Sequence, residues 1–178
     1  MRKQKKLGFF HKTTKSNKRL VEIFEKNQKD RYDGDWEDKK FVKNSTKEER
    51  RARKEILGML KKGEVRTRDD FYRAAWFFHH GNTFRSHGLA VALATVSYQL
   101  GEPWGKNFYA VALDRFLLSI NQPQSFGTQF EKKRGKWVVS PYNKNTTDKE
   151  RKLYFVDPIN KTLKNIEKLN LGKKNDKV

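Results

Sequence analysis

The amino-acid sequence predicts a mostly α-helical fold, a compact helical bundle with one small β-hairpin after its central helix. Three observations indicate this fold class. Apolar residues recur at helical spacing in several segments, and helix-capping residues precede many of them. Residues 108–120 are apolar on nearly every side, which is typical of a helix enclosed by protein. Further along, Arg134-Gly135 separates two short runs that read as strands.

The first two helices are expected before residue 63. Residues 20–28 carry apolar side chains on one face, and an Asp-Gly-Asp run then ends the pattern. Ser45 and Glu48 have the spacing of a capping box, in which each residue caps the other's backbone N–H group. A second, highly charged helix is therefore predicted from Ser45 to Lys62.

Two more helices are expected before the central one. Thr67 and Asp70 form another N-terminal cap, and this helix should end at 79–81 because glycine is favoured just past a helix end. The Ala-rich segment 89–100 follows, and Gly101 ends it. Small side chains allow close helix packing, so these two helices should lie against the central helix.

After the central helix the sequence predicts a hairpin and two short helices. Residues 128–131 and 136–139 read as paired strands. Thr147 and Glu150 have capping-box spacing and should begin a short helix. A last helix is expected over 161–170.

The central helix carries two charges that need partners. Asp114 and Arg115 lie about 100° apart around a helix, so they cannot pair with each other, and each must find a complementary group elsewhere. The helix is expected to be the least accessible element, with Leu113, Phe116 and Leu117 buried. The two charges therefore indicate either a functional site or a buried structural network.

Polar residues gather in a turn just past this helix. Gly127 would let backbone approach a ligand closely, while Gln124, Thr128 and Gln129 supply hydrogen-bond donors and acceptors. These four residues are candidate ligand contacts. The alternative is that the amides only satisfy buried loop backbone.

A histidine pair marks the end of the helix that begins near Thr67. A helix C-terminus favours a protonated imidazole, so His80 is a candidate acid, base or anion contact. The alternative is that it only caps carbonyl groups. With His79 and His87 it lacks metal-ligand spacing, so neither a metal nor another cofactor is expected.

Composition favours one domain with a basic arm. The chain has 178 residues, 35% hydrophobic and 13% aromatic, which suits a globular core with polar extensions. It divides into an arm (1–19), a helical domain (20–160) and a C-terminal helix with a tail (161–178). It has no cysteine, no apolar run long enough to span a membrane and no secretory signal, so a cytoplasmic protein without a membrane partner is expected.

The charge predicts an acidic partner. Lysine and arginine number 41 against 21 acidic residues, a net charge of +20. Cations and a few aromatic rings in the arm are the combination that contacts RNA or single-stranded DNA, and the alternative is a solvated lysine-rich tail. The candidate nucleic-acid contacts are Arg2, Lys3, Lys5, Lys6, Lys12, Lys15, Lys18 and Arg19.

The order of motifs around the central helix carries a resemblance. Asp114-Arg115, Pro123-Gln124 and Phe126-Gly127-Thr128-Gln129 follow one another as D-R, P-Q and F-G-T-Q. This order resembles the signature of a bacterial family of domains of unknown function, which are mostly helical. The family has no established reaction, so the resemblance implies a fold and a set of site positions.

The likeness extends over roughly residues 20–160. The family more often has glutamine where this chain has His79, so His80 is the matching histidine. The resemblance implies ligand contacts at Gln28, Asp30 and Arg31. The other matching positions are Asp70, Phe71, Tyr72, Gly81, Thr147, Asp148 and Arg151.

Three function classes stay open. The first is a binding module that holds RNA, DNA or a phosphorylated ligand through the arm and a polar pocket. The second is a small hydrolase or transferase for a nucleotide-like substrate, with catalytic roles for His80, Asp114 and Arg115. The third is a purely structural or protein-interaction domain. A pocket function predicts one polar cluster of Asp30 or Arg31, His80, Asp114, Arg115, Gln124 and Gln129.

Overall fold

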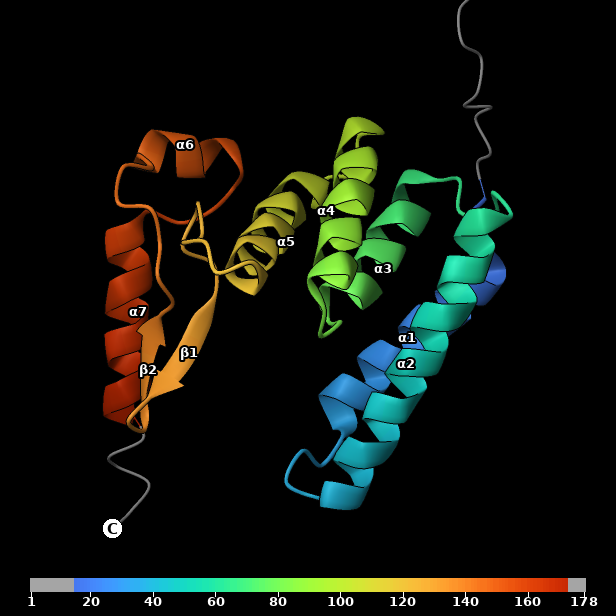
Figure 1. Ribbon diagram of the computed structural model, residues 1–178, viewed down its shortest axis with the longest axis horizontal. Helices are drawn as coiled ribbons and strands as arrows, with labels where there is room; N and C mark the ends of the chain where they lie inside the picture. Colours follow the sequence, from blue (N-terminus) through green and yellow to red (C-terminus); the bar gives the residue numbers. More distant parts are fainter. Residues whose placement is uncertain (1–14, 173–178) are drawn as a thin grey trace, which may run out of the picture.

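The computed structural model describes residues 15–172 and confirms a mostly helical fold with one hairpin after the central helices. In this range the elements are α1 (Lys18–Asp33), α2 (Lys39–Lys61), α3 (Arg68–His79), α4 (Phe84–Gln99), α5 (Gly105–Ser119), β1 (Phe130–Lys133), β2 (Lys136–Val139), α6 (Asp148–Leu153) and α7 (Ile159–Gly172). Figure 1 shows them as a row, with α1 and α2 at one end, then α3, α4 and α5, and the hairpin with α7 at the other end. No helix within residues 15–172 is long and apolar enough to cross a membrane.

Two predicted helix starts are confirmed and one is wrong. Thr67 caps α3 and Thr147 caps α6, each in a reciprocal capping box. Helix α2 starts earlier than predicted, because Asp38 accepts hydrogen bonds from the next free N–H groups, those of Lys40 and Phe41. Ser45 lies inside this helix and is buried, so it does not cap it.

The domain begins before residue 20, so the predicted arm is shorter than 1–19. Asn17 caps α1 with its side chain, and its backbone N–H donates to Asp70 Oδ1 over 3.0 Å. Ser16 donates or accepts a hydrogen bond with the Thr67 hydroxyl. Lys18 and Arg19 therefore belong to α1, whereas the other arm cations except Lys15 lie outside the described residues.

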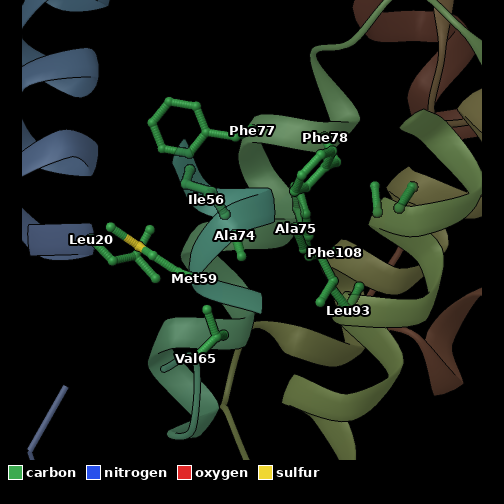
Figure 2. Packing of buried hydrophobic residues seen from close by; sticks show 13 residues of the cluster. Leu20, Ile56, Met59, Val65, Ala74, Ala75, Phe77, Phe78, Leu93 and Phe108 are labelled. Atoms are coloured by element: carbon green, nitrogen blue, oxygen red, sulfur yellow. The ribbon is translucent and has the colours of Figure 1, made fainter. Parts of the chain in front are cut away.

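Helix α3 is the middle of the hydrophobic core. Figure 2 shows Leu20, Ile56 and Met59 on one side of it and Leu93 and Phe108 on the other. The first three come from α1 and α2, and the last two come from α4 and α5. Two apolar faces on one helix explain why α3 has the largest share of buried residues, which are Asp70, Ala74, Ala75, Phe77, Phe78 and His79.

The expectation that the helix over 108–120 is the least accessible element is wrong. Leu113, Phe116 and Leu117 are only partly buried in α5. In a row of helices each one packs mainly on its neighbours, and α5 packs mainly on α4. The more enclosed position falls to α3, which contacts α1, α2, α4 and α5.

The hairpin has the predicted turn and second strand, but its first strand begins at Phe130, two residues later than predicted. Phe130 pairs with Val139 and Lys133 with Lys136 in an antiparallel ladder. Arg134 and Gly135 both have positive φ, as a two-residue hairpin turn requires. Strand β2 lies against α7, so the C-terminal helix covers the hairpin rather than the helical row.

Candidate functional site

Asp114 holds the turn that follows α5. Its Oδ1 accepts hydrogen bonds from the backbone N–H groups of Ser125 (2.7 Å) and Phe126 (2.9 Å). Its Oδ2 accepts from the backbone N–H and the hydroxyl of Thr128, each at 2.9 Å. Burial raises the pKa of Asp114, and these hydrogen bonds act in the opposite direction. Four donors and complete burial leave the carboxylate no oxygen for a ligand.

The glutamines of the turn satisfy loop backbone. Gln124 is fully buried, and its amide donates to the carbonyl groups of Gln129 and Ser140 while accepting the Gln129 N–H at 2.8 Å. Gly127 has φ +82, and a Cβ there would lie 2.9 Å from the Ile159 side chain. The close approach at Gly127 is therefore to α7. The geometry supports a structural role for this part of the turn.

Arg151 clamps the same turn from the opposite side. It is almost fully buried and donates from Nε to the Phe126 carbonyl at 3.0 Å. The Phe126 N–H donates to Asp114, so the two backbone polar groups of one residue are bound by a buried carboxylate and a buried guanidinium. Arg151 also pairs with Asp148, and both are among the positions that match the family resemblance.

Arg115 points from α5 toward the end of α3. Its Nε donates to Gln129 Oε1 at 2.9 Å, and its Nη1 donates to the His79 carbonyl at 3.3 Å. The Gln129 amide donates in turn to the Thr128 hydroxyl. The side chains of Asp114 and Arg115 do not pair with each other, as predicted. A chain of hydrogen bonds through Gln129 and Thr128 links them.

Arginines cap the C-terminus of α3. Arg53 of α2 lies within 3.5 Å of the Phe77 and His80 carbonyl groups, and Arg115 reaches that of His79. Cations are favourable at this negative end of a helix. The sequence predicted a protonated His80 as the cation at this helix end. In the structure, the guanidinium groups of Arg53 and Arg115 are the cations that bind these carbonyl groups.

The imidazoles at this helix end are neutral. Burial first, and then the positive charge of nearby arginines, lower the pKa of His79 to about 2 and that of His80 to about 3. Arg31, Arg53 and Arg115 all act on His80 in this way. The expectation of a charged His80 is therefore wrong, because the arginines already supply the positive charge.

Arg31 completes a group of three arginines from three helices. Its Nε donates to Asn27 and its Nη2 pairs with Glu49, which also pairs with Arg53 at 3.5 Å. Burial is the main cause that lowers the pKa of Arg115, and the positive charge of Arg31 is the second. We call Arg31, Arg53 and Arg115, with Glu49 and His80, the arginine cluster.

The arginine cluster has an excess of positive charge in a partly enclosed place. The exposed fractions of the side chains are 27% for Arg31, 17% for Arg53 and 13% for Glu49, so the cluster reaches the surface. Glu49 is the acid with which Arg31 and Arg53 form ion pairs within residues 15–172. Unpartnered ring nitrogens, Nδ1 of His79 and Nε2 of His80, lie at the same helix end. This arrangement can bind an anion.

The predicted site residues divide into two connected groups. Arg31, His80 and Arg115 meet in the arginine cluster, and Gln129 joins it to the turn. Asp114, Gln124, Gly127 and Thr128 lie in that turn and support it.

The other two predicted positions on α1 are peripheral. Gln28 contacts only its neighbour Asn27 among the described side chains. Asp30 lines a groove of about 290 Å³ between α1 and α2, which also contains Lys26 and Glu48.

Sequence reasoning missed Arg53, Glu49 and Asn27. Glu49 and Arg53 lie one helical turn apart in a helix full of charges, and they resemble any solvated i,i+4 pair. A detectable signal was the helical phase of α2, since Glu49 and Arg53 lie seven and three residues before the buried Ile56, on the same face of the helix. Asn27 had a similar signal beside Phe24 and Ile23.

No protein-family model, curated protein or solved structure matches this chain. The resemblance to a family of unknown function therefore stays a prediction. The chemistry of the site is read from its geometry and charge alone.

Proposed function

We propose that this chain binds a phosphorylated ligand through the arginine cluster. The observation that carries the proposal is the meeting of three helices at one place: Glu49 pairs with both Arg31 and Arg53, while Arg53 and Arg115 donate to the last carbonyl groups of α3. A guanidinium group presents paired N–H donors that match phosphate oxygens. Three of them around one point favour a ligand with several negative charges.

Mutual repulsion in the cluster supports a bound anion. Burial first, and then the positive charge of Arg31, lower the pKa of Arg115, so the charge of one guanidinium disfavours that of the other. Glu49 compensates one positive charge of three. A phosphate group between them would remove this repulsion, and partial burial strengthens such attraction because solvent screens it less.

A purely structural reading competes with this proposal. Arg53 and Arg115 stabilise the fold, since they cap the C-terminus of α3. The Arg31 side chain, by contrast, donates to Asn27 and Glu49 and to no carbonyl group of α3 within residues 15–172. Arg31 is therefore the residue that separates ligand binding from stability.

A hydrolase or transferase is a less well supported function. Asp114 has both oxygens engaged by four donors, so it has no free lone pair for a substrate proton. A pKa of about 3 makes His80 a weak general base at neutral pH. The cluster fits electrostatic binding better than proton transfer.

The net charge of +20 favours a second candidate, binding of nucleic acid by the N-terminal arm. Most arm cations precede residue 15 and lie outside the described residues. This candidate predicts binding that weakens steeply with salt and depends on the arm rather than on Arg31. It shares phosphate chemistry with the first proposal, so the two require separate variants.

The test is a thermal-shift series with inorganic phosphate, pyrophosphate and a nucleoside triphosphate. The wild-type protein should gain melting temperature with these anions, because a ligand that binds only the folded state stabilises it. Arg31→Gln should abolish the gain while keeping the melting temperature of the free protein. Arg19→Gln is the matched control, because it removes the same charge from the exposed face of α1. Equal gains in all three proteins would contradict the proposal.

A further inference from the structure

An exposed aromatic patch lies where α4, α5 and the segment after α6 meet. We define it as Tyr98, Trp104, Lys106, Tyr154 and Phe155. The Lys106 ammonium lies 5.6 Å from the ring centres of Tyr98 and Tyr154 and 6.0 Å from that of Phe155. Trp104 and Phe155 expose 67% and 66% of their surface. Lys106 thus shares one face with three rings, and Trp104 is exposed two residues before it, at the start of α5.

Phe155 has a strained backbone conformation and an exposed ring. Phe155 has φ +54, a left-handed conformation that bulky residues disfavour. It ends α6, since its N–H donates to the Lys152 carbonyl and the next N–H donates to that of Arg151. Glycine is the usual residue there, and the phenyl ring gains little burial in exchange. Such strain without packing points to a use for the ring.

The neighbouring parts of the patch are held firmly. Asn107 donates to the Tyr154 and Phe155 carbonyl groups at 3.4 and 2.9 Å. A Cβ at Gly105 would lie 2.9 Å from the Tyr98 nitrogen, so the start of α5 is seated directly on α4. Trp104, directly before Gly105, is exposed beside this contact.

We propose that the aromatic patch binds single-stranded nucleic acid by stacking bases on Trp104 and Phe155. Every base has a flat face, so exposed rings beside cations bind single strands with little sequence preference. Lys106 and Arg68 are placed for phosphates; Arg68 donates to the Gly101 carbonyl in the same linker as Trp104. The net charge of +20 complements a polyanion.

A protein partner fits the patch less well. Lysine is depleted at the centre of protein interfaces, and here a lysine lies against three of the rings. The acids Asp69 and Glu102 lie beside Arg68 at the rim of the patch.

The patch is separate from the arginine cluster. Helix α5 begins, and α6 lies, at the upper edge of the row in Figure 1, whereas α3 and α5 end at the lower edge. The arginine cluster lies at the end of α3. Nucleic-acid binding at the patch therefore does not depend on the proposed phosphate site.

The experiment measures affinity of the full chain for a labelled 12-nucleotide oligouridine. Phe155→Gly removes the ring and also the backbone strain, so it should keep or raise the melting temperature while weakening binding about fivefold or more. Trp104→Ser should weaken binding similarly. Trp36→Ser is the control, because Trp36 is also an exposed tryptophan but lies in the turn between α1 and α2.

Salt dependence separates the patch from the basic arm. Stacking releases no counterions, so the ratio of wild-type to Phe155→Gly affinity should stay constant as salt increases. Arg31→Gln should bind the oligonucleotide as the wild type does. Wild-type affinity in both patch variants would overturn the proposal. So would a change of self-association in these variants without a change of RNA affinity, which would assign the patch to a second copy of the chain.

Discussion

Arg115 donates a 2.9 Å hydrogen bond to Gln129, and this bond joins the end of α3 to the turn after α5. On the other side of the turn, Thr128 donates to Asp114. A change at either charged residue of α5 therefore acts on the same turn. Through Gln129, this turn also orients Arg115 of the arginine cluster.

Asp114→Asn should destabilise the fold. The amide keeps one acceptor oxygen and introduces an NH₂ group that faces backbone donors. A loss of about 1–3 kcal/mol in the free energy of unfolding is expected for buried donors left without an acceptor. Urea denaturation measures it, with the exposed Asp157→Asn as control. Equal unfolding midpoints would show that the turn does not depend on Asp114.

Arg115→Met should also destabilise the fold. Asp114 does not lose a partner, because it never contacts Arg115; the Gln129 amide and the His79 carbonyl lose a donor. About 1–2 kcal/mol is expected for these hydrogen bonds.

A double-mutant cycle tests whether the turn links the two charges. Asp114→Asn and Arg115→Met share Thr128 and Gln129, so their losses should not add. The coupling should be about 0.5 kcal/mol or more in denaturation experiments. Strict additivity would mean that the two residues act independently.

Acid should destabilise the protein below about pH 6.5. The pKa of His79 is lowered to about 2 and that of His80 to about 3, so in this window the unfolded chain binds protons that the folded chain does not. Stability is fully present above pH 6.5 and falls toward pH 3, by about 1.4 kcal/mol per pH unit for each imidazole. His80→Gln should flatten the profile of melting temperature between pH 7 and 4.5. An unchanged slope would show that His80 is not buried in its neutral form.

The position of the core predicts unequal costs of truncation. Ile56→Ala removes a fully buried side chain packed beside α3 and should cost about 2–5 kcal/mol. Leu117→Ala, at a partly buried site of α5, should cost clearly less. Chemical denaturation compares the two. A larger loss at Leu117 would restore α5 as the centre of the core.

The boundary of the arm predicts two different deletions. Removing residues 1–14 should leave the melting temperature unchanged and reduce RNA affinity in low salt. Removing 1–19 should also lower the melting temperature, because Asn17 caps α1 and its backbone donates to Asp70. Identical melting temperatures for the two deletions would contradict the role of Asn17.

Local signals predicted much of the fold. Thr67 with Asp70 and Thr147 with Glu150 are capping boxes in the structure, and Arg134-Gly135 is the hairpin turn. These features depend on residues within four positions of each other. The helix start predicted at Ser45 was wrong because an earlier residue, Asp38, can also cap a helix and does so here.

The site was harder to predict because its partners are distant in sequence. The isolation of Asp114 from Arg115 followed from helix geometry alone, but their partners come from a turn and from α3. His80 was expected to be charged because nothing local reveals that Arg53, 27 positions upstream, takes its place. Only packing decides which cation reaches a helix end.

The most direct test of the arginine cluster is calorimetric titration of pyrophosphate into wild-type protein, Arg31→Gln and Arg19→Gln. Wild type and Arg19→Gln should bind with the same affinity, and Arg31→Gln should bind at least tenfold more weakly, since loss of a charged hydrogen bond costs about 1.5–3 kcal/mol. All three should have the same melting temperature without ligand. Equal affinity of Arg31→Gln and wild type, or no heat of binding in any of them, would contradict a phosphate site in the cluster.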